Sequence, residues 1–119
     1  MRTLNLMIAI VALSQSFAAL AFNTFSVGDM PIRYMSDEDK RIFEAALIEV
    51  LERSSDGEST HWQNAKTSAH GDLTPRASFE RAGARCRDLE VANSAKGRDN
   101  RLVVTLCKQA DGEWKVDQQ

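Results

Sequence analysis

The feature that most constrains this sequence is the placement of its two cysteines, Cys86 and Cys107, on either side of a turn. The segment between them contains NSAKGRDN, which is rich in turn-forming residues and has Gly97 near its middle. A turn centred between Lys96 and Gly97 places Cys86 opposite Cys107 in an antiparallel hairpin. The spacing therefore predicts a long β-hairpin with the two sulfurs on neighbouring strands.

The hydrophobic pattern supports the same register. It pairs Leu89 with Val104 and Val91 with Leu102, so that these four apolar side chains share one face of the hairpin. The two cysteines fall on the opposite face together with Val103. Turn position and side-chain alternation thus give one consistent pairing.

Residues 1–21 have the layout of a secretory signal peptide. Arg2 gives a positive start, and residues 6–13 form an unbroken apolar run. Ala-Leu-Ala at 19–21 and Ser-Phe-Ala at 16–18 both fit the small-x-small cleavage rule. The alternative is an uncleaved membrane anchor, which needs about 20 apolar residues, whereas polar residues 14–16 interrupt this run. We therefore expect an exported protein whose mature chain has no transmembrane helix.

Export brings the two thiols into an oxidising compartment, where they are expected to pair. Closing this loop should stabilise the fold by about 3 kcal/mol through the entropy of the unfolded chain. A redox pair and a zinc site that recruits His61 and His70 are the alternatives. Neither has the expected spacing, because Cys-x-x-Cys and paired metal ligands are absent. We predict a Cys86–Cys107 disulfide that clamps the hairpin.

A single amphipathic helix is predicted near the start of the mature chain. Residues 22–35 show no clear period and are expected to form an extended arm or linker. Ser36 then provides an N-cap and Asp39 completes a capping box, while Asp56-Gly57 ends the helical pattern. Apolar residues recur between them at helical spacing, namely Phe43, Ala46, Leu47, Val50 and Leu51.

The remainder of the chain predicts strands and gives an α+β fold. Residues 58–65 and 70–81 form a first hairpin around Thr67-Ser68, and Pro75 marks an edge or a bend. Asp111-Gly112 predicts a two-residue turn that places Trp114 opposite Gln109. We expect residues 36–117 to form one domain, with the helix packed on an antiparallel meander of four or five strands. Trp114 would then share the disulfide's face, so we expect the helix to cover that face.

No catalytic, cofactor-binding or metal-binding constellation is recognisable in the sequence. The alternative to a non-enzymatic protein is a small periplasmic enzyme or inhibitor with a site near His61, Trp62 and His70. A third possibility is a small-ligand groove on the sheet, lined by Val91 and Leu102. Each of these two alternatives requires a concave site.

Charge does not point to nucleic acid. The formal net charge is −2 and charged residues make up 27% of the chain. Acidic neighbours dilute the one basic cluster, so a phosphate-binding patch is disfavoured; the cluster comprises Arg76, Arg81, Arg85 and Arg87.

An ordered series of short motifs resembles the C-terminal domain of the bacterial 17 kDa surface antigen family. The resemblance covers residues 36–116. The motifs in order are Trp62-x-Asn64, Gly71, Thr74-Pro75, Phe79, Gly83, Cys86-Arg87, Cys107-Lys108 and Asp111-Gly112-x-Trp114.

This resemblance implies an exported cell-envelope protein with no catalytic residues and no cofactor. Its partner would be another envelope protein or an outer-membrane component. Two family features are missing, namely a cysteine for lipidation after the apolar run and a glycine-zipper segment before the domain. We therefore expect a structural or interaction domain in the periplasm or at the outer membrane, without a lipid on cysteine.

Overall fold

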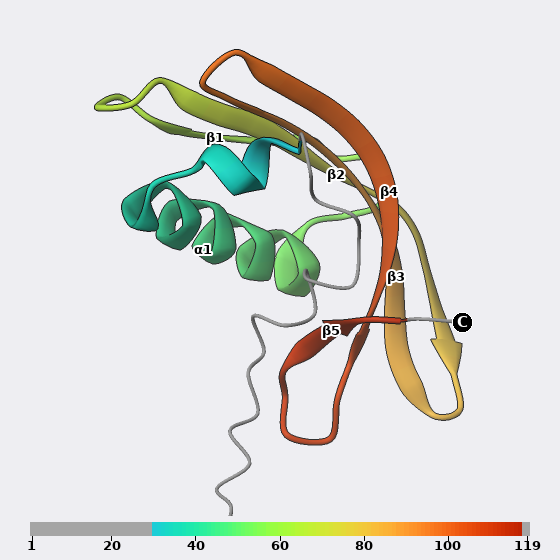
Figure 1. The fold of residues 1–119 in the computed structure, drawn as a ribbon. Coiled ribbons are helices and arrows are strands. Elements are labelled where there is room, and N and C mark those ends of the chain that lie inside the picture. The colour runs from blue at the N-terminus through green and yellow to red at the C-terminus, as the bar shows by residue number, and fades with distance from the viewer. Residues whose placement is uncertain (1–29, 118–119) are drawn as a thin grey trace, which may run out of the picture.

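The structure, a computed structural model, describes residues 30–117, in which one α-helix packs against one curved antiparallel sheet (Figure 1). The predicted signal peptide and residues 22–29 of the expected arm lie outside the described residues. The elements in chain order are η2 (Pro31–Tyr34), α1 (Asp37–Arg53), β1 (Thr60–Asn64), β2 (Ala69–Arg81), β3 (Ala84–Ala95), β4 (Arg98–Lys108) and β5 (Trp114–Val116). The predicted α+β class is confirmed, with five strands in the sheet.

Helix α1 begins at the predicted capping box. The backbone N–H of Asp39 donates to Ser36 Oγ at 3.0 Å, and Ser36 N–H donates to Asp39 Oδ2 at 2.8 Å. These two bonds satisfy N–H groups that the first turn of a helix otherwise leaves without partners. The short helix η2 precedes α1 and occupies part of the region expected to be extended.

The strands follow one another across the sheet in the order β1-β2-β3-β4-β5. The β3–β4 register pairs Cys86 with Cys107, as the turn position predicts, and the two sulfurs are bonded. Lys96 and Gly97 form the turn with φ values of 50° and 78°. This is the left-handed pair that a two-residue hairpin turn requires.

Strand β2 bends where the sequence places a proline. The β2–β3 register shifts between Pro75 and Ala77, which marks a β-bulge. Beyond Leu73, β1 no longer pairs with β2, so this stretch of β2 has a free edge. The Pro75 carbonyl instead accepts the Gly57 N–H at 2.7 Å, which connects the bend to the α1–β1 loop.

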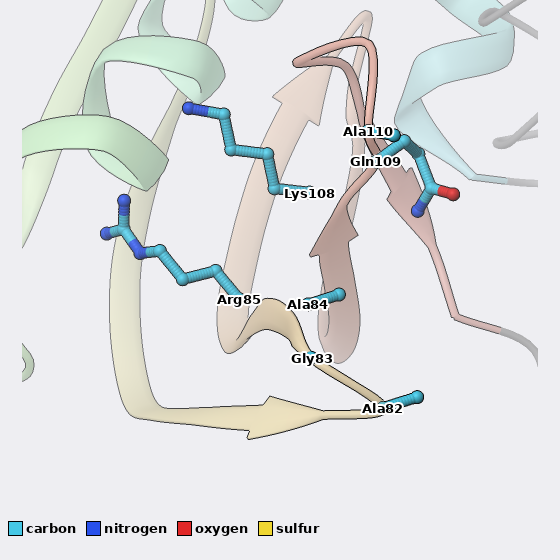
Figure 2. A pocket seen from close by; sticks show the side chains of 7 residues that line it. All are labelled: Ala82, Gly83, Ala84, Arg85, Lys108, Gln109 and Ala110. Carbon is cyan, nitrogen blue, oxygen red and sulfur yellow. The ribbon is translucent and has the colours of Figure 1, made fainter.

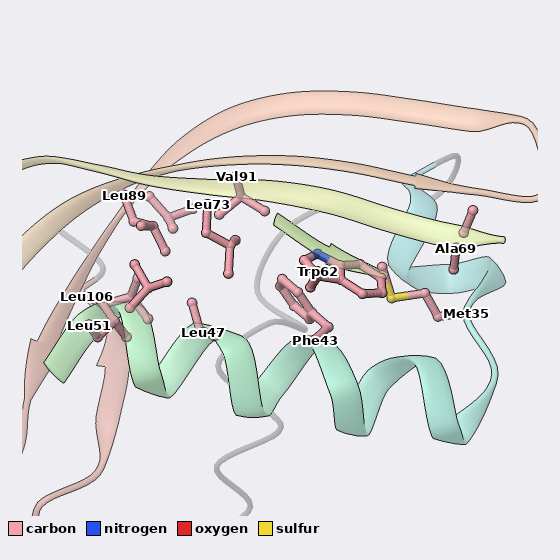
Figure 3. Close-up of a cluster of buried hydrophobic side chains, with 13 residues drawn as sticks. Met35, Phe43, Leu47, Leu51, Trp62, Ala69, Leu73, Leu89, Val91 and Leu106 are labelled. Atoms are coloured by element: carbon pink, nitrogen blue, oxygen red, sulfur yellow. The ribbon is translucent and has the colours of Figure 1, made fainter. Parts of the chain in front are cut away.

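The core lies between α1 and the sheet face that carries Leu89 and Val91 (Figure 3). Leu47 and Leu51 of α1 pack against that face, where Leu89 is fully buried. The expectation that the helix covers the disulfide face is therefore wrong. The third possibility, a ligand groove lined by Val91 and Leu102, is wrong as well, because both side chains pack into or against the core.

The expectation for the helix-covered face is wrong because the predicted register of the β4–β5 hairpin differs from the observed register by one residue. Lys108 pairs with Trp114 and Leu106 pairs with Val116, whereas a two-residue Asp-Gly turn would place Trp114 opposite Gln109. Because side chains alternate along a strand, a shift of one residue moves a whole strand's side chains to the other face. Trp114 and Val116 therefore pack against the core beside α1.

The loop that produces this shift spans residues 109–113. The Gln109 N–H donates to the Glu113 carbonyl at 2.7 Å, and the Glu113 N–H donates to Asp111 Oδ1 at 2.9 Å. Asp111 thus stabilises a longer loop through its side chain instead of a two-residue turn.

Candidate functional site

The most heavily bonded side chain on the inner face of the sheet is Arg87, which is only 3% exposed. Arg87 Nη1 donates to the carbonyls of Val50 at 3.1 Å and Leu51 at 2.9 Å. Its Nη2 donates to the Ser54 carbonyl at 2.7 Å. These carbonyls belong to the last turn of α1, where intrahelical partners run out. Arg87 therefore caps the helix from near the start of strand β3.

Two further contacts complete the coordination of this guanidinium. Its Nη2 donates to Asp56 Oδ1 at 2.9 Å, and its Nε donates to Ser78 Oγ at 2.8 Å. The hydrogen bonds from Arg87 and Ser78 hold the pKa of Asp56 below its usual value. One side chain thus connects β3, β2, the helix end and the α1–β1 loop.

A second polar cluster stabilises the other end of α1. Asp39 is 1% exposed and accepts hydrogen bonds from Asn64 Nδ2 at 2.7 Å and Thr67 Oγ1 at 2.6 Å. Burial alone would raise the pKa of Asp39, but the bonds from Thr67, Ser36 and Asn64 outweigh it and lower that pKa. The Trp-x-Asn motif thus joins the β1–β2 hairpin to the start of the helix.

Trp62 lies on the inner face and is bonded across the sheet. Its Nε1 donates to Asn93 Oδ1 at 2.9 Å. Gly71 lies between these two residues in the sheet, because it is the register partner of Trp62 on β1 and of Asn93 on β3. A Cβ at Gly71 would lie 2.1 Å from Asn93 Oδ1 and 2.5 Å from Trp62 Nε1. A glycine is therefore required at this position by close approach.

The carboxylate of Glu52 connects the last hairpin to α1. Trp114 Nε1 donates to Glu52 Oε2 at 2.7 Å, and Lys108 Nζ lies 3.0 Å from the same oxygen. These bonds, first that from Trp114 and then that from Lys108, lower the pKa of Glu52. Arg85 stacks above the Trp114 ring at 5.6 Å.

The residues proposed as an enzymatic site do not converge. His61 and His70 lie on the outer face of the β1–β2 hairpin, with ring centroids 6.0 Å apart, while Trp62 points into the core. His61 Nδ1 lies 2.9 Å from Asp72 Oδ1, and this hydrogen bond raises the pKa of His61. The two imidazoles are solvent-exposed side chains on the outer face of the sheet.

The outer face of the sheet carries the disulfide and an ion-pair network centred on Glu90. Glu90 is 8% exposed and is bonded by Arg101 at 2.8 Å and by Arg76. The bond from Arg101, followed by that from Arg76, lowers the pKa of Glu90. Val103 on the same face is 58% exposed.

Two further observations concern the described part of the chain. Within residues 30–117, no group of three or more His, Cys, Asp or Glu side chains is placed to hold a metal ion. Over the same residues, no helix combines the length and the apolar character needed to cross a bilayer.

Comparison with known proteins assigns the chain to a protein family. Residues 49–115, more than half of the chain, match the family model described as 17 kDa outer membrane surface antigen. The chain belongs to the 17 kDa surface antigen family. Family membership suggests an envelope-exposed protein. No solved structure is detectably similar to this chain.

Individual surface antigens show the extent of the similarity. The 17 kDa surface antigen of Rickettsia bellii (strain RML369-C) is 28% identical over 83 residues, which cover 69% of this chain and 52% of that protein. The 17 kDa surface antigen of Rickettsia prowazekii (strain Madrid E) is 29% identical over 81 residues, or 67% of this chain and 51% of that protein. The chain thus spans about half the length of the curated relatives it matches.

The motifs that carry the surface-antigen resemblance have structural roles in this fold. Each of their main polar or sulfur-containing side chains binds another part of the same chain. These side chains are Trp62 to Asn93, Asn64 to Asp39, Cys86 to Cys107, Arg87 to the end of α1, and Lys108 and Trp114 to Glu52.

The buried role of Arg87 does not follow from the sequence interpretation above, which places this residue in one basic cluster with Arg76, Arg81 and Arg85. Its alternation with Leu89 and Val91 on one strand face was the signal that could have identified it as buried.

Proposed function

We propose that this surface-antigen domain is a non-enzymatic part of the cell envelope that binds or supports another envelope component. It would work after export, in the periplasm or at the outer membrane, and without a lipid on cysteine. The observation that carries this proposal is the internal use of the motif side chains. Arg87, Asn64 and Trp114 all use their hydrogen-bonding groups to hold α1 to the sheet.

Such internal bonding supports a rigid interaction module and not a reactive centre. A catalytic group has to present its reactive atom to a substrate within hydrogen-bond reach. The buried Arg87 guanidinium instead contacts the chain's own carbonyls, and the buried Asp39 carboxylate accepts a hydrogen bond from Thr67 in the turn of the β1–β2 hairpin. The motif residues therefore support a structural role, because their polar groups stabilise the fold of the domain.

The first test is location and contact in intact cells of the native host. A photo-crosslinking amino acid would be placed at three well-separated exposed positions, namely Ile48 on α1, Val103 on the outer sheet face and Ala110 in the last loop. We expect the chain in the envelope fraction, with a discrete adduct of constant mass from at least one position and none from another. Each probe position serves as the control for the other two.

Two results would contradict this proposal. Recovery of the chain in the cytosolic fraction would reject the exported role. Adducts of the same kind from all three positions, or from none, would reject a specific contact, because a defined interface covers only part of a small domain's surface.

A further inference from the structure

The sheet divides in two just beyond the disulfide. The β3–β4 ladder ends at the pair Cys86–Cys107. Past this point β3 continues to pair with β2 as far as Ala84, whereas β4 pairs with β5 at Lys108. The two hairpins therefore diverge, as the lower part of Figure 1 shows.

A hollow of about 480 Å³ lies between the diverging hairpins, and we call it the notch (Figure 2). One side is the β2–β3 turn with the start of β3, and the other is the end of β4 with the following loop. Small residues form most of its walls. The lining residues are Ala82, Gly83, Ala84, Arg85, Lys108, Gln109 and Ala110.

The notch offers main-chain edges as well as space. Strands β3 and β4 are hydrogen-bonded neighbours above the disulfide, but no strand lies between them below it. Edges of this kind accept an extended chain by adding it to the ladder. The volume falls within the range of about 300–1,000 Å³ typical of small-molecule sites.

The notch carries two positively charged side chains, Arg85 and Lys108. Lys108 is paired with Glu52 at 3.0 Å. The Arg85 guanidinium carbon lies 5.6 Å from the centroid of the Trp114 ring, and its charge also acts on the Glu52 carboxylate, whose pKa it helps to lower. The two cations of the notch thus face one carboxylate, which leaves one positive charge in excess. The guanidinium fork has several N–H donors that suit a planar anion. Figure 2 shows that both cationic side chains extend in the same direction from the notch.

We infer that the notch binds the end of an extended peptide or peptide-like chain and holds its terminal carboxylate on Arg85. A carboxylate matches the guanidinium fork with two parallel hydrogen bonds and neutralises the positive charge that Arg85 and Lys108 together carry in excess over Glu52. The small walls formed by Ala82, Ala84 and Ala110 fit small side chains at that terminus. This assignment deepens the interaction role proposed above and rests on it for its biological setting.

The test is an NMR titration of the purified, disulfide-bonded protein. The probes are N-acetyl-alanyl-alanine with a free carboxylate and the same dipeptide as its C-terminal amide. We expect the acid to shift the amide signals of residues 84–85 and 108–110 and the Trp114 indole signal. The amide should bind about tenfold more weakly or worse, because it loses the charge-assisted pair.

Variants assign the binding to Arg85. Arg85→Gln should weaken binding of the acid by about tenfold or more, while Arg41→Gln should leave its affinity unchanged. Arg41 is the matched control because its side chain is 74% exposed and pairs with Glu38 at the start of α1, whereas the notch residue Lys108 contacts Glu52 at the other end of the helix. Both variants should retain the circular dichroism spectrum of the parent.

Three outcomes would overturn the inference. They are equal binding of acid and amide, an Arg85→Gln variant that binds as well as the parent, and free acetate that binds as tightly as the dipeptide. The last result would leave a simple anion contact with no role for the strand edges. This experiment uses purified protein, so its failure is distinguishable from failure of the envelope role, which the cell fractionation tests.

Discussion

Arg87 supplies the sharpest prediction, because a single buried side chain joins the helix to the sheet. Arg87→Met keeps the length of the side chain and its packing but removes every hydrogen bond that the guanidinium makes. The Leu51 and Ser54 carbonyls then lose the partner shown in the structure. The Val50 carbonyl keeps the Ser54 N–H at 3.0 Å and is less affected.

The magnitude follows from these two carbonyls. Leaving a buried acceptor without a partner costs about 1–2 kcal/mol at a partly accessible helix end, which gives a total loss of about 2–4 kcal/mol. Arg87→Lys should lose less, because its ammonium can still reach some of the acceptors with three donors. A domain of this size has a free energy of unfolding of about 5–10 kcal/mol, so the loss is large but measurable.

Urea unfolding of the oxidised protein, followed by circular dichroism, measures this loss. With an m-value of about 1 kcal/mol per molar urea, the Arg87→Met midpoint should fall by about 2 M or more. The matched control is Arg85→Gln on the same strand and face, which removes an exposed cation–π contact of about 0.5–1 kcal/mol and a solvent-screened interaction with Glu52. A loss below about 1 kcal/mol for Arg87→Met would refute the capping role, since it would not exceed that of the control.

Three further predictions follow from the same contacts. Gly71→Ala should destabilise by about 1–3 kcal/mol through overpacking, and urea unfolding should show a smaller cost for the same substitution in an Asn93→Ala background; an equal cost in both backgrounds would contradict the close approach of Asn93. Cys86→Ser or Cys107→Ser should cost about 3 kcal/mol and lower the melting temperature markedly; an unchanged melting curve would count against the clamp. The pKa of Asp39 is lowered in the folded state, so its contribution is complete above the unfolded-state value of 3.8 and is lost as the pH falls through the folded-state pKa. Asp39→Asn should therefore be less stable at pH 7 and lose less stability than the parent between pH 5 and pH 2, measured by thermal melts; parallel pH profiles would refute this assignment.

Local patterns in the sequence were sufficient to predict most of the fold. The helix followed from its capping box and apolar spacing, because both depend on residues a few positions apart. The β3–β4 register followed from one turn and the alternation of side chains, and it placed Cys86 opposite Cys107 as observed.

What could not be predicted depended on one residue of register or on contacts between distant elements. The Asp-Gly pair favoured a two-residue turn, but the Asp111 side chain stabilises a longer loop and reverses the face of Trp114. The role of Arg87 requires the end of α1 to lie over β3, which no local pattern specifies. The notch likewise arises only where two hairpins diverge in space.

The most direct test of this account is the thiol state of the chain in growing cells. Acid quenching, fractionation and alkylation with a mass-tagged maleimide would count the free thiols of Cys86 and Cys107 in each fraction. The account predicts a chain in the envelope fraction that is unmodified without reductant and gains two tags after reduction. A cytosolic chain that carries two tags before reduction would contradict both the stapled architecture and the envelope role.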